Sequence, residues 1–229
     1  MFKHLNLVTL FALTTMGLSS PASANLILLT YGSGSATPTN IGSYNMTDFA
    51  FSGIEVGSTS GVNSPISGSL GFEDVSNNSM LLNRNTADNV SWWNNGESSN
   101  YDIFTTDEHL VTILLPENTF AFSFNVSADL EYTGNNAWIT ATETDGPGIN
   151  SQHNFNVSKE NTPGFGIYAD NSNGNCSTLS SVTIEPDYWG VGNFSINQGS
   201  CVKVPEPSSL ALLALGVIGL GFTHRKNKI

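Results

Sequence analysis

The sequence predicts an all-β protein, an antiparallel β-sandwich with a jelly-roll-like arrangement, from three observations. Short segments alternate apolar and polar residues, as in "FAFSFNV", where Phe120, Phe122, Phe124 and Val126 are expected on one face of a strand. Breaks rich in Gly, Asn and Pro separate these segments. The central part of the chain lacks long stretches of helical periodicity. Many short strands between turns are typical of a sandwich.

About ten strands follow from this alternation. "HLVTILLP" is expected to end at Pro116, with Glu117 and Asn118 forming a turn into "FAFSFNV". The polar stretch from Val75 to Asn100 is expected to hold two loops around a short edge strand. The expected strands cover residues 26–31, 44–56, 66–72, 109–116, 120–126, 137–144, 153–158, 165–170, 180–185 and 189–196.

The amino terminus has the three-part layout of a secretory signal. Lys3 and His4 form a polar, basic start, an apolar stretch covers residues 5–18, and Ala22-Ser23-Ala24 is a small-x-small cleavage pattern. We therefore predict that residues 1–24 are a signal peptide, cut after Ala24, and that the protein is exported.

The exported part is strongly acidic. The whole chain has a formal net charge of −12, and Arg84, Lys159 and Lys203 are its only basic residues between the two ends. Such a surface repels phosphate backbones and anionic lipid headgroups, so nucleic acid is not expected as a partner. Sugars and cations remain compatible with it.

Both cysteines, Cys176 and Cys201, fall in the exported part. An exported pair is expected to form one disulfide. Such a bond would close a loop of about 25 residues and stabilise the fold by roughly 3–4 kcal/mol in the chain-entropy description. A metal site or two free thiols are the alternatives.

The carboxyl terminus, residues 204–229, joins three elements in a fixed order. Pro205-Glu206-Pro207 is followed by the apolar run 208–222, which as a helix would measure about 22 Å and fall short of a bilayer core of about 30 Å. A basic cluster containing Arg225 and Lys226 ends the chain. This cluster predicts a cytoplasmic stub, with the acidic domain on the outer side of the membrane.

These three elements resemble the PEP-CTERM sorting signal of Gram-negative bacteria. The resemblance covers about 25 residues, and it departs from the family pattern only in that His224 opens the basic cluster. It implies that an exosortase, a membrane-embedded cysteine transpeptidase-like enzyme, recognises Pro205, Glu206 and Pro207. It further implies transient insertion in the inner membrane, cleavage near these residues, and delivery to the cell surface or extracellular matrix, often where exopolysaccharide is made. The expected organisation is thus signal peptide 1–24, domain 25–203 and sorting signal 204–229.

The sequence does not predict an enzyme. Asp107 and His109 would share a face in an extended strand, but no serine in a Gly-x-Ser-x-Gly turn and no free cysteine completes a nucleophilic set. A polysaccharide hydrolase that uses two carboxylates is the alternative. The acidic pairs available to it are Glu73–Asp74, Glu143–Asp145 and Glu185–Asp187.

No cofactor is expected, and calcium is the one cation considered. "DNSNGN", from Asp170 to Asn175, offers closely spaced oxygens, and Asp145 lies in a Gly-rich turn. The EF-hand order of ligands is missing, and an Asx-rich turn explains the same residues without metal.

Trp92 and Trp93 are the expected carbohydrate-binding residues. They lie among Asn94, Asn95 and Glu97, and in a strand they would face opposite sides. An exposed indole beside amides and carboxylates suits a sugar, while burial of both rings is the alternative. The expected function is a structural or adhesive role within exopolysaccharide, with weak carbohydrate binding. A matrix protein without any ligand is a further alternative.

Overall fold

A computed structural model defines the fold. It describes residues 25–32, 37–49, 57–86, 102–128, 135–143, 149–157, 162–171, 176–185 and 189–200. Throughout these ranges the regular structure is β-strand, and none of them contains a helix of the length and apolarity that crossing a membrane requires. The predicted signal peptide and the apolar helix of the carboxyl terminus lie outside the described residues.

The strands pair antiparallel throughout. They are β1 (Asn25–Tyr31), β2 (Asn40–Ile41), β3 (Tyr44–Asn45), β4 (Thr47–Asp48), β5 (Gly57–Thr59), β6 (Gly61–Asn63), β7 (Ser69–Glu73), β8 (Leu82–Thr86), β9 (Asp102–Thr106), β10 (Val111–Ala128), β11 (Asn135–Glu143), β12 (Ile149–Val157), β13 (Gly164–Asp170), β14 (Leu179–Glu185) and β15 (Trp189–Gln198). The prediction of an all-β, antiparallel protein is confirmed, whereas the jelly-roll-like arrangement stays a prediction.

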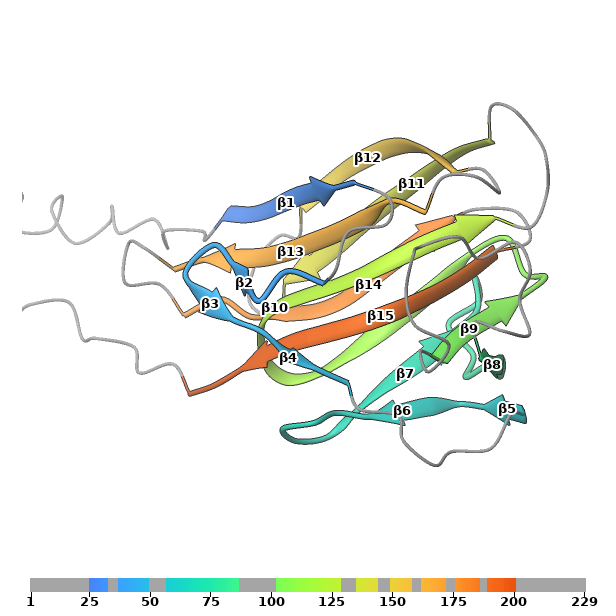
Figure 1. Ribbon diagram of the computed structural model, residues 1–229, viewed down its shortest axis with the longest axis horizontal. Helices are drawn as coiled ribbons and strands as arrows, with labels where there is room; N and C mark the ends of the chain where they lie inside the picture. The colour runs from blue at the N-terminus through green and yellow to red at the C-terminus, as the bar shows by residue number, and fades with distance from the viewer. Residues whose placement is uncertain are drawn as a thin grey trace, which may run out of the picture.

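The long strand β10 belongs to both layers of the structure. Its first half pairs with β14 and β7, and β14 continues to β11 and β12. Its second half pairs with β13 and β15, which continue to β1 on one side and to β9, β8 and β5 on the other. Figure 1 shows β1, β13, β10 and β15 running side by side.

A corner in the middle of β10 sends its two halves into different layers. The register against β14 shifts between Leu114 and Thr119, and Asn118 has a left-handed backbone with φ of 61°. The Thr119 hydroxyl donates to the carbonyl of Pro116 at 2.6 Å. The expected turn at Glu117 and Asn118 is therefore a bulge within one strand, not a connection between two strands.

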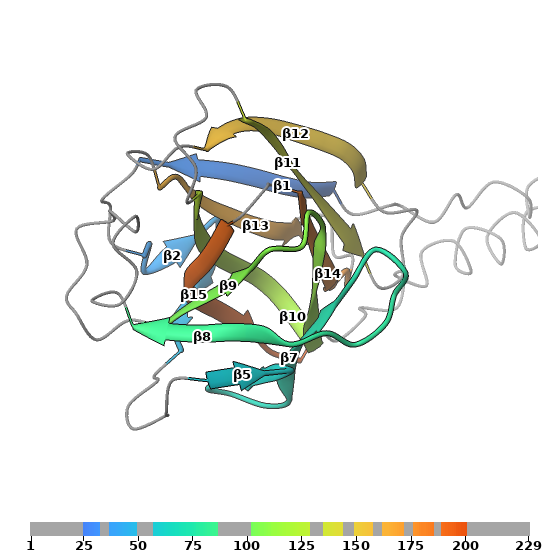
Figure 2. The same cartoon turned by 90° about the vertical axis from the view of Figure 1, so that its right-hand side faces the viewer.

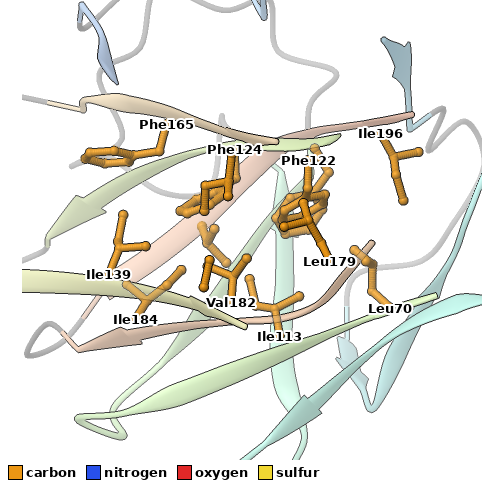
Figure 3. Packing of buried hydrophobic residues seen from close by; sticks show 14 of the residues in the cluster. Leu70, Ile113, Phe122, Phe124, Ile139, Phe165, Leu179, Val182, Ile184 and Ile196 are labelled. Carbon is orange, nitrogen blue, oxygen red and sulfur yellow. The ribbon is translucent and has the colours of Figure 1, made fainter. Parts of the chain in front are cut away.

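The core lies between the two layers, where the apolar side chains of both layers meet (Figure 3). Phe122, Phe124 and Phe165 come from one layer, and Ile139 and Val182 come from the other. The alternation of the sequence produces this face, because neighbouring positions along each strand point in opposite directions.

Phe120 does not join this face as the alternation predicts. The register against β15 shifts between Thr119 and Ala121, so that Phe120 falls on a second bulge. Its ring stacks on Tyr44 at 5.7 Å, whereas the ring of Phe122 stacks on those of Phe124 and Phe194. One extra residue in the strand is enough to move a side chain out of the expected row.

The second half of β10 is buried on both faces, although its alternation predicts burial on one. Ala121, Ser123 and Asn125 are fully buried on the face turned away from the core. Ser123 and Ser195 hydroxyls lie 2.6 Å apart there, and the Asn125 amide donates to the carbonyl of Thr162 at 3.3 Å. These bonds satisfy polar groups that alternation alone would place in water.

Two glycines of β13 make room for the residues that cover this face. An added Cβ at Gly164 would lie 1.8 Å from the Tyr31 ring, and one at Gly166 would lie 2.9 Å from Ile41. The Tyr31 ring lies against Gly164, and its hydroxyl donates to the carbonyl of Phe124 at 3.2 Å. The amino-terminal strands therefore close this side of the molecule.

The region around β8 also differs from expectation. β8 lies within the predicted polar stretch, but it pairs on both sides, with β9 and with β5, so it is not an edge strand. The short strands β5, β6 and β9 carry weak alternation and were not predicted.

Candidate functional site: an open sheet face and the exit of the chain

The layer that contains β7, β11 and β14 leaves its outer side accessible. Its outward positions are only half-buried or exposed, while the residues between them are buried in the core. We call this surface the open face. It consists of Gly71, Glu73, Thr112, Leu114, Thr140, Thr142, Ser181, Thr183 and Glu185.

Strand register arranges the open face in rows across the strands. Thr140 on β11 pairs with Thr183 on β14, Thr183 pairs with Thr112 on β10, and Thr112 pairs with Glu73 on β7. We call these four residues the hydroxyl row. Neighbouring strands are about 4.8 Å apart, so each strand contributes one oxygen-bearing side chain at that interval.

A second row runs beside the first. It contains Thr142, Ser181, Leu114 and Gly71 on the same four strands. Leu114 is 36% exposed, and Gly71 presents no side chain. This row therefore combines hydroxyls with a small apolar surface.

Backbone register adds one aromatic position to this layer. Trp138 on β11 pairs with Glu185 on β14 and with Asn154 on β12. The sequence reasoning did not single out Trp138, because its relation to the threonine row depends on the pairing of three strands.

Of the three carboxylate pairs considered for hydrolysis, the structure describes both members of one, Glu73–Asp74. Asp74 accepts hydrogen bonds from the backbone N–H groups of Ser76 and Asn78, both at 2.8 Å, and from the Asn78 amide at 3.2 Å. These bonds lower the pKa of Asp74, which disfavours a role as general acid. In each of the other two pairs, Glu143–Asp145 and Glu185–Asp187, the aspartate lies outside the described residues.

The Asp107–His109 segment is an exposed turn between β9 and β10, not a strand. The Glu108 N–H is bonded to the Thr106 hydroxyl at 3.1 Å, which fixes the start of the turn. Alternation therefore does not place Asp107 and His109 on a common strand face, as the sequence analysis assumed.

Asn171, one of the candidate calcium ligands, uses its side chain for hydrogen bonds within the protein. The Asn171 side-chain oxygen accepts from the Ser177 N–H at 2.9 Å, and its amide donates to the Ser177 carbonyl at 3.0 Å and the Tyr44 hydroxyl at 3.2 Å. Asn171 thus ties the two ends of this loop together, as an Asx-rich turn would. Residues 172–175 lie outside the described residues, and the described ranges contain no group of three acidic, His or Cys residues with the spacing for a metal ion.

The last described strand, β15, ends at Gln198. Both the oxygen and the nitrogen of the Gln198 side-chain amide form hydrogen bonds. Its oxygen accepts from the Ser64 hydroxyl at 2.6 Å and the Ser67 N–H at 3.3 Å. Its nitrogen donates to the carbonyls of Ser67 at 3.1 Å and Glu117 at 3.0 Å. The N–H of Gly199 donates to the Asn118 carbonyl at 3.1 Å. We call this set of contacts the exit clamp.

Both ends of the folded domain lie at the same end of the molecule. β1 starts at Asn25, which pairs with Asp170, and β15 ends at Gln198 (Figure 1). Asn25 is the residue that follows the predicted signal-peptidase site at Ala22 and Ala24, and that site lies outside the described residues.

The two predicted disulfide partners lie near the ends of two strands that both pair with β10, because Cys176 precedes β14 and Cys201 follows β15. Thr119 pairs with Leu179, three residues after Cys176, and also with Gln198, three residues before Cys201. The start of β14 and the end of β15, which are the strand ends nearest to the two cysteines, therefore lie on either side of Thr119. Cys201 lies outside the described residues, and the bond stays a prediction.

Trp92 and Trp93 also lie outside the described residues, as do Pro205, Glu206, Pro207, Arg225 and Lys226. The segment that carries the two tryptophans starts after Thr86 and ends before Asp102, and these two residues pair with each other. The segment is therefore a connection between neighbouring strands. β9 and β8, which it joins, are visible in the end-on view of Figure 2.

Comparisons with known proteins locate one feature in the chain. Residues 203–226 match the PEP-CTERM protein-sorting motif. The chain matches none of the curated proteins with which it was compared. A solved structure of TmCBM61 in complex with beta-1,4-galactotriose is similar with a TM-score of 0.27 and 14% identity, over 52% of this chain and 82% of that one. At this TM-score the similarity supports no inference about the present chain.

Proposed function

We propose that this chain, which carries a PEP-CTERM protein-sorting motif, is delivered outside the cell by an exosortase and acts as a structural or adhesive component of exopolysaccharide. The observation that carries the proposal is the motif at residues 203–226, which starts shortly after the last strand ends at Gln198. The motif indicates export to the cell surface or extracellular matrix. The polysaccharide role, weak carbohydrate binding and the absence of catalysis are the proposed parts.

The exit clamp supports the processing part of the proposal. Cleavage near Pro205–Pro207 removes residues that come after Gln198 and Gly199, which make the last hydrogen bonds in the described part of the chain. The folded part therefore keeps its hydrogen bonds when the tail is cut. Before cleavage, the tail holds the domain to the inner membrane through the apolar run 208–222.

Charge restricts the class of polysaccharide. The chain has 19 acidic and 7 basic residues, and most of the basic ones belong to its two ends. An anionic polymer is repelled by such a surface at short range, and the repulsion is weakened by salt. Neutral polysaccharides are therefore the proposed ligands. Trp92 and Trp93 are the sequence-predicted residues that would stack on their sugar rings.

Affinity electrophoresis of the mature extracellular protein tests the proposed function. Gels containing a neutral glucan or mannan are expected to retard the protein relative to a gel without polysaccharide. Retardation is expected to weaken in the variant Trp92→Ala/Trp93→Ala, because the stacking of sugar rings on the two indoles is lost. A protein that migrates equally in all gels would contradict binding.

The length of the polysaccharide, measured after incubation with the same protein samples, distinguishes binding from hydrolysis. A binding protein leaves the length of the polysaccharide unchanged after long incubation. Shortening of the polysaccharide that disappears on the change Glu185→Gln or Glu73→Gln would instead establish the carboxylate hydrolase.

A further inference from the structure

We propose that the open face is the polysaccharide-binding surface, and that one neutral sugar chain lies across β11, β14, β10 and β7 along the hydroxyl row. This inference rests on the proposed function and deepens it, since it names the surface and the direction of the bound chain.

The two outer faces of the molecule differ in how far they are covered. The outer face of the β13–β10–β15 layer is closed by Tyr31 and Ile41, and its residues Ser123 and Ser195 are fully buried. The open face has the same kind of short polar side chains, but Thr142 is exposed and Thr140 and Thr183 are only half-buried. The fold thus seals one polar sheet surface and leaves the other accessible to a ligand.

The spacing of the strands that carry the hydroxyl row suits a polysaccharide. Thr140, Thr183 and Thr112 supply one hydroxyl-bearing side chain per strand, on neighbouring strands about 4.8 Å apart. This interval is similar to the length of one sugar unit in an extended polysaccharide. A chain that crosses the strands can therefore meet the same kind of contact at successive units.

The side chains of the hydroxyl row can form hydrogen bonds with sugar hydroxyls. Each threonine hydroxyl can donate one hydrogen bond and accept two, as sugar hydroxyls do. The hydroxyl oxygens of Thr112 and Thr183 lie 2.9 Å apart, so these side chains are already held in place by each other before a ligand arrives. Glu73 ends the row with a carboxylate, which accepts hydrogen bonds from sugar hydroxyls.

The second row provides the apolar part of the contact. Leu114 lies beside the hydroxyl row with 36% of its surface exposed, and the missing side chain at Gly71 lets a ligand approach the backbone. Sugar rings have apolar C–H faces that pack on such surfaces.

Charge selects the ligand class. The nine residues of the open face include two carboxylates, Glu73 and Glu185, and no lysine or arginine. An acidic polysaccharide would meet repulsion without any compensating cation. The occupant is therefore a neutral polysaccharide and not an anionic one.

The double variant Thr112→Val/Thr183→Val tests the row while preserving the fold. Valine keeps the β-branched shape and strand propensity of threonine, and both partners of the 2.9 Å contact are removed together, which leaves neither hydroxyl unpaired. We expect about tenfold weaker retardation by neutral glucan or mannan, because two hydroxyl contacts to the sugar are lost. A melting temperature close to that of the wild type is expected.

Two further variants complete the design. Thr142→Arg places a long side chain over the second row and is expected to abolish retardation by neutral chains. Thr47→Arg is the matched control, because Thr47 is an exposed strand threonine on β4, which pairs with β15 in the other layer. This control is expected to bind like the wild type. Alginate serves as the anionic polysaccharide.

The outcomes distinguish the two proposals. A wild-type protein that no polysaccharide retards overturns the proposed function, and this inference with it. Retardation that is unchanged in both open-face variants but lost in Trp92→Ala/Trp93→Ala overturns the open face and leaves the proposed function standing. Retardation by alginate but not by neutral chains overturns the assignment of ligand class.

Discussion

The substitution Gly164→Ala is expected to lower the free energy of unfolding by about 3 kcal/mol, because it forces a methyl group into the Tyr31 ring. An ideal Cβ at position 164 would lie 1.8 Å from one ring carbon of Tyr31 and 2.3 Å from two others. The ring cannot simply turn aside, since the Tyr31 hydroxyl is bonded to the carbonyl of Phe124. Urea denaturation, followed by tryptophan fluorescence, measures the change.

Gly71→Ala is the matched control for this substitution. Gly71 also lies in a strand that pairs with β10, but its added Cβ would meet Leu114 at 3.5 Å, an ordinary contact. Alanine there is expected to preserve stability or raise it by about 0.5 kcal/mol, through the lower entropy of the unfolded chain. Equal effects of the two substitutions would show that Tyr31 does not pack over Gly164.

Loss of the predicted Cys176–Cys201 disulfide is expected to lower stability by roughly 3 kcal/mol, according to the chain-entropy description. The bond would close the loop that contains β14 and β15, the two strands that flank Thr119. Both strands pair with β10, so opening the loop loosens the centre of both layers. The measurement compares denaturation of the oxidised protein with that of Cys176→Ser/Cys201→Ser.

A mass determination under denaturing conditions accompanies this comparison. The oxidised protein is expected to lack the two thiol hydrogens and to resist alkylation until a reductant is added. Alkylation of both cysteines without reductant would contradict the bond, as would a double variant with wild-type stability.

The parts of the fold that depend on local pattern were predictable. Alternation located most of the longer strands to within a few residues, for instance β13 and β15, because a half-buried strand repeats every two residues. The sorting signal was predictable too, since proline, apolar length and basic charge follow each other along a short segment.

The parts that depend on long-range pairing were not predictable. Phe120 leaves the core row because β10 bulges against β15, which lies about 70 residues further along the chain. Ser123 and Asn125 look like surface residues, but segments near the amino terminus cover them. Alternation predicts that one face of a strand is polar, but it does not predict whether another segment of the chain covers that face.

The same reasoning explains why the hydroxyl row was missed. Thr140, Thr183 and Thr112 are unremarkable strand threonines in three separate segments, and register alone brings them into line. Sequence reasoning selected Trp92 and Trp93 instead, because a pair of aromatic residues among amides is visible within a single segment.

Intact-mass and terminal-sequence analysis of the extracellular protein from its native cells tests the central claim most directly. The account predicts a product that begins at Asn25 and ends near Pro205–Pro207, without the apolar run 208–222. A secreted product that still carries that run and the basic residues Arg225 and Lys226 would contradict sorting by cleavage of the tail.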